Sequence, residues 1–124
     1  MKLEILEQAF SVCKTASIGD MSCKSGFCFI ARTDEENSLV CPTEEVPEDT
    51  IAREDGFRGL RVEGTLDFSL IGILAGICGI LAERRIGVFV VSTFNTDYIF
   101  VRAEDLEKAV ISLEENGYEI GKET

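Results

Sequence analysis

The sequence contains no histidine and no tryptophan among its 124 residues, and it has only two prolines. Histidine is the usual general base beside a Ser or Cys nucleophile, so its absence removes the commonest route to nucleophilic catalysis. The sequence also lacks a phosphate-binding glycine loop, a nucleophile elbow and a dinucleotide-binding fingerprint. We therefore expect no catalytic residues and no cofactor. An enzyme that uses a Cys or Asp nucleophile without histidine is the alternative.

Positive charge is also scarce, since 12 Lys and Arg stand against 23 Asp and Glu and give a formal net charge of −11. Both signs are spread through the two halves of the chain, without a basic stripe. Nucleic acid and anionic membranes bind clustered cations, so we expect neither as a partner. The longest apolar run without a charge, Phe68–Ala82, is shorter than the roughly 20 residues that a membrane-spanning helix needs.

The start of the chain, "KLEILEQ" after Met1, is acidic and alternating, and it lacks the cationic and apolar segments of a signal peptide. We therefore expect a cytoplasmic protein. The sequence contains five cysteines, an odd number, and no two of them are separated by two residues. Without histidine, a metal site would need thiolates at irregular spacing, so we expect reduced thiols and no metal.

The C-terminal half has readable periodicities. Gly59–Leu66 alternates apolar and polar residues, as a half-buried strand does, and the following segment to Arg85 carries apolar residues at helical spacing. Ile86–Phe94 is a continuous apolar run, which predicts a strand covered on both faces. Further along, Thr96–Val101 predicts a strand, and Ala103–Gly117 predicts an amphipathic helix. That helix has inward residues Leu106, Ala109, Val110 and Leu113 and a C′ residue at Gly117, and a short strand at Tyr118–Ile120 follows it.

This order, β-α-β-β-α-β, predicts an α+β fold of the ferredoxin-like type, with an antiparallel four-stranded sheet and two helices on one face. Residues 1–58 carry four strand-like segments and little helical signal. We interpret them as a helix-poor half with the same sheet pattern. The acidic segment 42–56, which holds both prolines, is predicted to be a solvated connection. The predicted division is therefore 1–58 and 59–124.

Three glycines fall in the first predicted helix. Close packing is the simplest explanation for Gly76 and Gly79. Gly72 falls in the predicted first turn, where backbone N–H groups lack helical acceptors. With Ser69 as the N-cap, the amides of residues 70–73 would form an end that attracts anions.

Residues 60–118 resemble an ACT domain, a small-molecule regulatory module. The most specific pieces are "GTLDFSLIGILA", Gly64–Ala75, and "STFNTDYIFVRAEDLEKA", Ser92–Ala109. The resemblance is greatest to short free-standing proteins with two ACT-like halves, whose relatives include aspartate kinase regulatory domains and cytosolic arginine sensors. It implies a non-catalytic allosteric sensor that binds an amino acid. It also implies a homodimer, and an unidentified protein partner to regulate.

The resemblance further implies a ligand site with two walls. The first wall is the loop that leads into the helix, and its residues are Asp67, Phe68, Ser69, Gly72 and Ile73. The second wall is the end of a strand, and its residues are Thr93, Phe94, Asn95, Thr96 and Asp97. Free amides at the helix start would attract a ligand carboxylate, and Asp67 or Asp97 would pair with an ammonium group.

Each of these residues also has a structural explanation. Asp67 and Ser69 could only cap the helix, and Asn95 and Asp97 could only shape a turn. Gly72 could simply permit close packing, and the two phenylalanines could be core residues. Leu70 stands where some sensors carry an acidic residue that holds the ligand, which leaves the ligand's identity open. The alternative function is a structural or protein-interaction module with a vestigial pocket.

Overall fold

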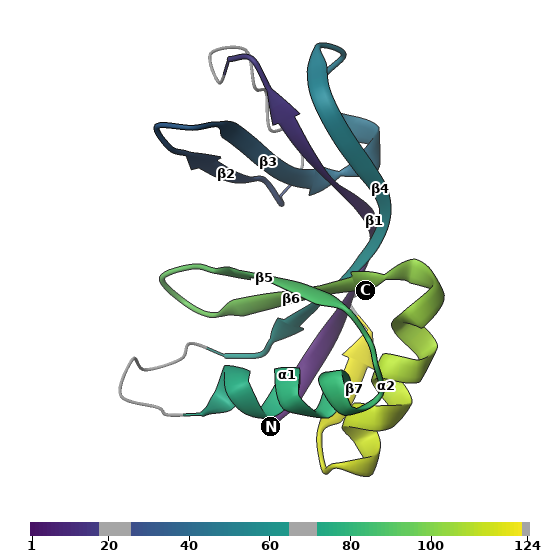
Figure 1. Cartoon of the computed structure of the whole chain (residues 1–124). Helices are drawn as coiled ribbons and strands as arrows, with labels where there is room; N and C mark the ends of the chain where they lie inside the picture. The colour runs from purple at the N-terminus through teal and green to yellow at the C-terminus, as the bar shows by residue number, and fades with distance from the viewer. Residues whose placement is uncertain (18–25, 65–71, 123–124) are drawn as a thin grey trace. The chain divides into compact units, whose positions relative to one another are not determined.

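The computed structural model describes residues 1–17, 26–64 and 72–122 (Figure 1). They form two compact units. The helical unit contains Met1–Glu7 and the chain from Arg58 onward, and the strand unit contains Gln8–Phe57. The first seven residues therefore lie with the C-terminal part of the chain. That residues 1–58 and 59–124 are two separate ACT-like halves stays a prediction.

Two long strands, β1 (Lys2–Thr15) and β4 (Thr50–Val62), run through both units. In the helical unit the strand order is β7-β1-β4-β6-β5. Its other strands are β5 (Val88–Ser92), β6 (Asp97–Arg102) and β7 (Glu119–Lys122). Strands β5 and β6 pair antiparallel, with Ser92 opposite Asp97, whereas β1 and β7 pair parallel, with Lys2 opposite Glu119.

The predicted βαββαβ order is confirmed, but the sheet contains one strand more than predicted. The start of β1 lies between β4 and β7, which would otherwise be neighbours. Two contacts show that β1 and β4 run antiparallel here. The Glu63 N–H donates to the Lys2 carbonyl at 2.9 Å, and Arg61 Nη2 contacts Glu4 Oε2 at 3.2 Å. The inserted strand fits because Leu3 joins the core beneath the helices.

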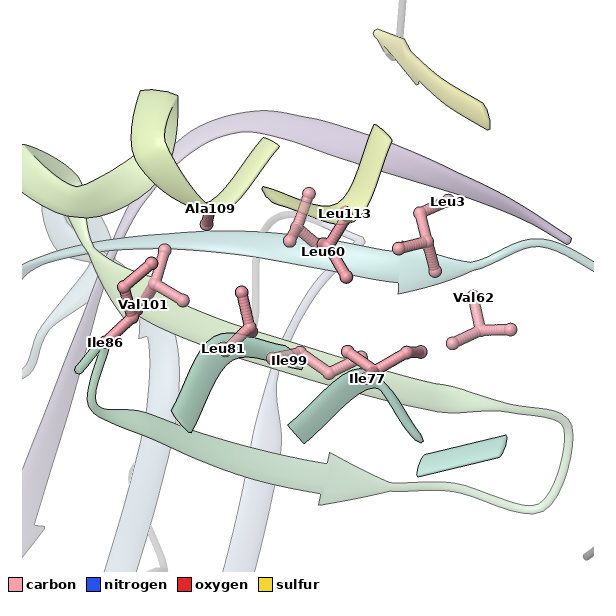
Figure 2. Packing of buried hydrophobic residues seen from close by; sticks show 10 residues of the cluster. All are labelled: Leu3, Leu60, Val62, Ile77, Leu81, Ile86, Ile99, Val101, Ala109 and Leu113. Carbon is pink, nitrogen blue, oxygen red and sulfur yellow. The ribbon is translucent and has the colours of Figure 1, made fainter. Parts of the chain in front are cut away.

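The core of the helical unit lies between this sheet and two helices, α1 (Ile73–Glu83) and α2 (Leu106–Glu115) (Figure 2). Leu60 and Val62 are two residues apart on β4, so they face the same side of the sheet. Both contribute to one cluster with α1 and α2, which places the two helices on one face, as predicted. The fully buried side chains of this cluster are Leu3, Leu60, Val62, Ile77, Leu81, Ile99, Val101, Ala109 and Leu113.

Both helices end in the same hydrogen-bonded motif. After α2, the Tyr118 N–H donates to the Leu113 carbonyl at 3.1 Å, and the Gly117 N–H donates to Glu114. Gly117 has φ +93°, which confirms it as the C′ residue. After α1, Ile86 donates to Leu81 and Arg85 donates to Ala82, but the C′ residue is Arg85 with φ +60°. A residue with a Cβ is strained in this conformation.

Replacing Arg85 by Gly should therefore raise the free energy of unfolding by about 1 kcal/mol. The gain should appear as a higher urea midpoint with an unchanged slope. Arg85→Ala is the matched control, since it removes the same charge and keeps a Cβ at positive φ. An equal gain in both variants would mean that the charge, and not the backbone, causes the effect.

The prediction that the strand before the turn is covered on both faces is wrong. The apolar residues of β5 are only half-buried, and Ser92 is exposed. Strand β5 is the last strand of the order in the described part of the chain, with β6 as its neighbour. An apolar run alone does not reveal how many neighbours a strand has.

In the strand unit, β1 pairs antiparallel with β3 (Asn37–Pro42), which pairs antiparallel with β2 (Phe29–Arg32). A short 3₁₀ helix, η1 (Thr43–Glu45), follows β3. The two N-terminal strand segments that the sequence suggested form one continuous strand, β1. The predicted solvated connection 42–56 is only partly correct, because from Thr50 onward it is β4, although its side chains there are largely exposed.

The cysteines differ from the prediction of reduced thiols at one described position. Cys13, Cys41 and Cys78 are free, but Cys28 is disulfide-bonded. Burial raises the pKa of all three free thiols, that of Cys41 to about 11. A reactive Cys nucleophile needs the opposite shift, so these thiols are poorly suited to catalysis at neutral pH. Among the described residues no group of three or more His, Cys, Asp or Glu is arranged to hold a metal ion.

Candidate functional site

The turn between β5 and β6 is closed by Thr93 and Thr96. The Thr93 N–H and hydroxyl both donate to the Thr96 carbonyl, at 2.9 and 3.0 Å, and the Thr96 N–H donates back to Thr93 Oγ1 at 3.3 Å. Phe94 and Asn95 form the tip of this turn and are exposed. The side chain of Phe94 is 82% exposed, so it is not a core residue of the chain.

Thr96 also ties the turn to the end of β4. Its hydroxyl donates to the Val62 carbonyl at 2.7 Å, and the residue is buried. This bond holds the tip of the β5–β6 hairpin beside the point where the chain leaves β4 towards α1. Thr96 was predicted to belong to the second wall of the site, but the Thr96 hydroxyl already donates its proton to the backbone.

Asp97, the first residue of β6, is half-buried and accepts a hydrogen bond from Ser92 Oγ at 2.6 Å. Ser92 lies directly opposite on β5, so the two strands hold the carboxylate in place. The charge of Asp97 also reaches α1. Burial is the main cause of the raised pKa of Cys78, and the nearby Asp97 carboxylate raises it further.

The start of α1 differs from the prediction. Gly72 is the N-cap and precedes the helix, with φ +81° and ψ 2°, and it has no side chain to cap the helix. Its carbonyl accepts the Gly76 N–H at 2.8 Å, which leaves the N–H groups of the first three helical residues without a helical acceptor. Asp67, Phe68, Ser69 and Leu70 lie outside the described residues.

Gly72 and Ile73 line a surface depression of about 340 Å³ within the helical unit. Its other walls come from Met1 and from the segment that follows α2. The residues of that segment are Asn116, Gly117 and Tyr118. This wall could not be predicted from the sequence, although the C′ glycine at Gly117 marked where the segment turns.

The glycines of α1 differ in their surroundings. A Cβ at Gly76 would lie 3.4 Å from the Tyr118 hydroxyl, so Gly76 allows this side chain to approach the helix. Gly79 has no described atom within 4 Å of a Cβ position, and the close packing predicted there is wrong. Gly76 therefore leaves room for Tyr118, one of the residues that line the depression.

The start of α1 and the turn between β5 and β6 lie at the same end of the helical unit (Figure 1). The Thr96 bond to Val62 joins the hairpin tip to the end of β4, and the Glu119 N–H donates to the Met1 carbonyl at 3.0 Å beside the depression. Residues Thr93–Asp97 do not line the depression itself. The described chain thus presents two features at one end of the helical unit. One is a helix start whose first amides have no acceptor within the helix, and the other is a turn whose carboxylate is held by Ser92.

Solved structures resemble this chain over nearly its whole length. The Agobacterium tumefaciens protein Atu0741 is 32% identical and has a TM-score of 0.88, over 99% of this chain and 93% of that chain. The aspartate kinase of Clostridium acetobutylicum is 15% identical, with a TM-score of 0.65, over 88% of this chain and 33% of that chain. Aspartokinase III of E. coli, in complex with aspartate and ADP, is 12% identical with a TM-score of 0.64, over 93% of this chain and 32% of that chain.

The kinase similarities concern the fold, and this chain spans about a third of each enzyme. A comparison with curated proteins gives no match. A family model described as the ACT domain matches residues 52–115, which include most of β4 and all of α1, the β5–β6 hairpin and α2. The fold, the order of its elements and this match agree, and the chain belongs to the ACT domain family.

Proposed function

We propose that this protein is a non-catalytic regulatory module of the cytoplasm that binds an amino acid at this end of the helical unit. Membership of the ACT domain family supports a regulatory role. The observation that carries the proposal is the start of α1, where the first backbone amides have no acceptor within the helix and follow a left-handed glycine that adds no side chain to shield them. No helix of the described residues is long and apolar enough to cross a membrane.

The ligand would use its two charged groups at the two features. Its carboxylate would accept hydrogen bonds from the N–H groups at the start of α1, where the helix dipole also favours negative charge. Its ammonium group would pair with Asp97, whose position is fixed by Ser92. Thr93 and Asn95 would add polar contacts, and Phe94 would cover an apolar side chain. Asp67, Phe68 and Ser69 complete the proposed first wall.

A homodimer would bring the two walls together most directly. Thr93–Asp97 and the depression beside Gly72 are separate in one chain. The Asp97 turn of a second copy would close the open side of the depression. Strand β5 pairs with β6 and is the last strand of the described order, so it offers an edge for such an association.

The alternative function is a protein-interaction module whose pocket is vestigial. The exposure of Phe94 at the hairpin tip supports it, because an aromatic ring at a turn is a common contact for a partner. In that case no amino acid would stabilise the protein, and Phe94→Ala would weaken self-association or the capture of a partner. The response to amino acids separates the two functions, because only the amino-acid site predicts a ligand that raises Tm.

Replacing Asp97 by Asn should abolish most of the stabilisation by an amino-acid ligand. A thermal-shift screen of the common amino acids should identify a ligand that raises Tm, since a ligand at 100 times its Kd contributes about 2.7 kcal/mol. The amide oxygen of Asn still accepts the Ser92 hydrogen bond, so the variant removes the charge and retains the fold. We expect the Tm of the variant to rise by less than half as much.

Asp34→Asn is the matched control for this experiment, because it makes the same change at an exposed turn of the strand unit. It should respond to the amino acid as the wild type does. If no amino acid raises Tm, the amino-acid function fails. If Asp97→Asn responds fully, the ligand binds elsewhere and this site assignment fails.

A further inference from the structure

Cysteines from three segments gather in the strand unit. Cys13 on β1 and Cys41 on β3 are buried, and they form a small cluster with Leu39. Cys28, the residue before β2, packs against this cluster. Cys13 and Cys41 are free thiols, whereas Cys28 is disulfide-bonded. Because Cys78 is also free, the present partner of Cys28 lies outside the described residues. One cluster therefore combines a disulfide sulfur with two thiols.

The pairing of β2 with β3 places Cys41 beside Cys28. Phe29 lies opposite Val40 in the register of the two strands. One step further towards the start of β2, the same register sets Cys28 opposite Cys41. Side chains of directly opposite residues lie on the same face of a sheet, which agrees with the packing of both cysteines in one cluster.

The geometry of this pair suits a disulfide. The Thr33 N–H donates to the Glu36 carbonyl at 2.9 Å and closes the β2–β3 hairpin, so these two residues form a hydrogen-bonded pair. Hydrogen-bonded and non-hydrogen-bonded pairs alternate along an antiparallel ladder. Cys28 and Cys41 are an odd number of steps further on, so they form a pair of the second type, with Cα atoms about 4.5 Å apart. A disulfide needs a Cα separation of about 4.4–6.8 Å.

Cys13 belongs to the same cluster but does not face Cys28. It lies on β1, opposite Leu39. Strand β3 lies between β1 and β2, so Cys13 and Cys28 are separated by two strand spacings, which is roughly 9–10 Å. This separation is too large for a disulfide. Of the two described thiols in the cluster, only Cys41 is within reach of Cys28.

We propose that the strand unit contains a thiol–disulfide switch, in which Cys41 displaces the present partner of Cys28. The Cys41 thiolate attacks Cys28 Sγ. A bond between these two sulfurs forms while the existing disulfide of Cys28 breaks, and the electron pair of that bond leaves with the partner's sulfur. The released thiolate takes up the proton that Cys41 lost, so the exchange needs no oxidant and no reductant. The new disulfide joins β2 to β3, and this site shares no residue with the amino-acid site.

The surroundings of Cys41 make the exchange slow at neutral pH. Burial is the main cause of its raised pKa, which is about 11, and Cys13 and Glu45 add to this effect, whereas Arg53 lowers the pKa. The thiolate is the attacking species, so the rate should rise about ten-fold with each pH unit below that pKa. The same burial shields Cys41 from dissolved oxidants, whereas the disulfide of Cys28 is already beside it.

The test holds the full chain, with its Cys28 disulfide formed, without reductant at about pH 7, 8 and 9. Free thiols are then blocked with N-ethylmaleimide, and the chain is digested with trypsin. Cleavage after Lys24 and Arg32 leaves Cys28 in peptide 25–32, and cleavage after Arg53 leaves Cys41 in the next peptide. We expect mass spectrometry to show these two peptides joined by a disulfide, at an initial rate that rises about ten-fold per pH unit.

Two variants provide the controls. Cys41→Ala should leave Cys28 with its present partner at every pH. Cys13→Ala removes the other buried thiol of the cluster, so it shares any loss of packing, and it should exchange as the wild type does. Asp97→Asn should also exchange normally, so failure here and failure of the amino-acid function are separate outcomes.

Three results would overturn the proposal. The first is a wild type in which the two peptides are not joined even at the highest pH. The second is joining of the Cys13 peptide to the Cys28 peptide in equal amount, which would show random exchange in opened chains. The third is loss of the exchange in a folded Cys13→Ala, which would mean that Cys41 does not attack Cys28 directly.

Discussion

Leu113→Ala should lower the free energy of unfolding by about 2–5 kcal/mol, the range for removing a large aliphatic side chain from a packed core. Leu113 is fully buried on the inner face of α2 and lies in the cluster that joins both helices to the sheet (Figure 2). Its carbonyl also accepts the Tyr118 N–H that ends the helix. The side chain is lost in the variant and the backbone bond is kept, so the effect reports on packing.

Ile111→Ala is the matched control on the same helix. Ile111 is 46% exposed, so the same kind of truncation should cost less than about 1 kcal/mol. Both variants are measured by urea unfolding followed by circular dichroism. Equal losses in the two variants would contradict the assignment of the inner and outer faces of α2.

Gly59→Val should lower the free energy of unfolding by about 1–3 kcal/mol or more, because the site has no room for a side chain. A Cβ at Gly59 would lie 3.0 Å from Phe100 Cε1 and 3.3 Å from Leu6 Cδ1. The Phe100 ring is fully buried and stacks on Phe89, with 4.8 Å between ring centroids, so it cannot easily move aside. Valine adds two further carbon atoms beyond that Cβ.

Gly87→Val is the control for this substitution, since no described atom lies within 4 Å of its Cβ position. It should change the free energy of unfolding by no more than about 0.5 kcal/mol. In a double-mutant cycle, Phe100→Leu should recover part of the loss in Gly59→Val, because the smaller side chain makes space. Strict additivity of the two changes would show that Phe100 is not the group that valine displaces.

The helices and their buried faces could be predicted from the sequence because they depend on local periodicity. The spacing of Ile77, Leu81, Ala109 and Leu113 indicated the residues that the structure buries, but Val110, which was also predicted to face inward, is only half-buried. The insertion of β1 between β4 and β7 could not be predicted, because strand pairing is decided by contacts between distant segments. The partial exposure of β5 could not be predicted for the same reason.

The turn of the candidate site could be predicted from the sequence, but the depression beside the start of α1 could not. Asn and Asp between two apolar runs marked the β5–β6 turn, and Gly117 marked the end of α2. The depression beside Gly72 was not foreseen, because its walls come from Met1, the start of α1 and the segment after α2.

The parallel pairing of Lys2 with Glu119 has a consequence for synthesis in the cell. These two residues lie near opposite ends of the described chain, and loops of this length close slowly. The first strand leaves the ribosome early, but its partner β7 is made only after both helices. Until then, the backbone edge of β1 at Lys2–Ile5 stays unpaired, and an unpaired strand edge is prone to aggregation.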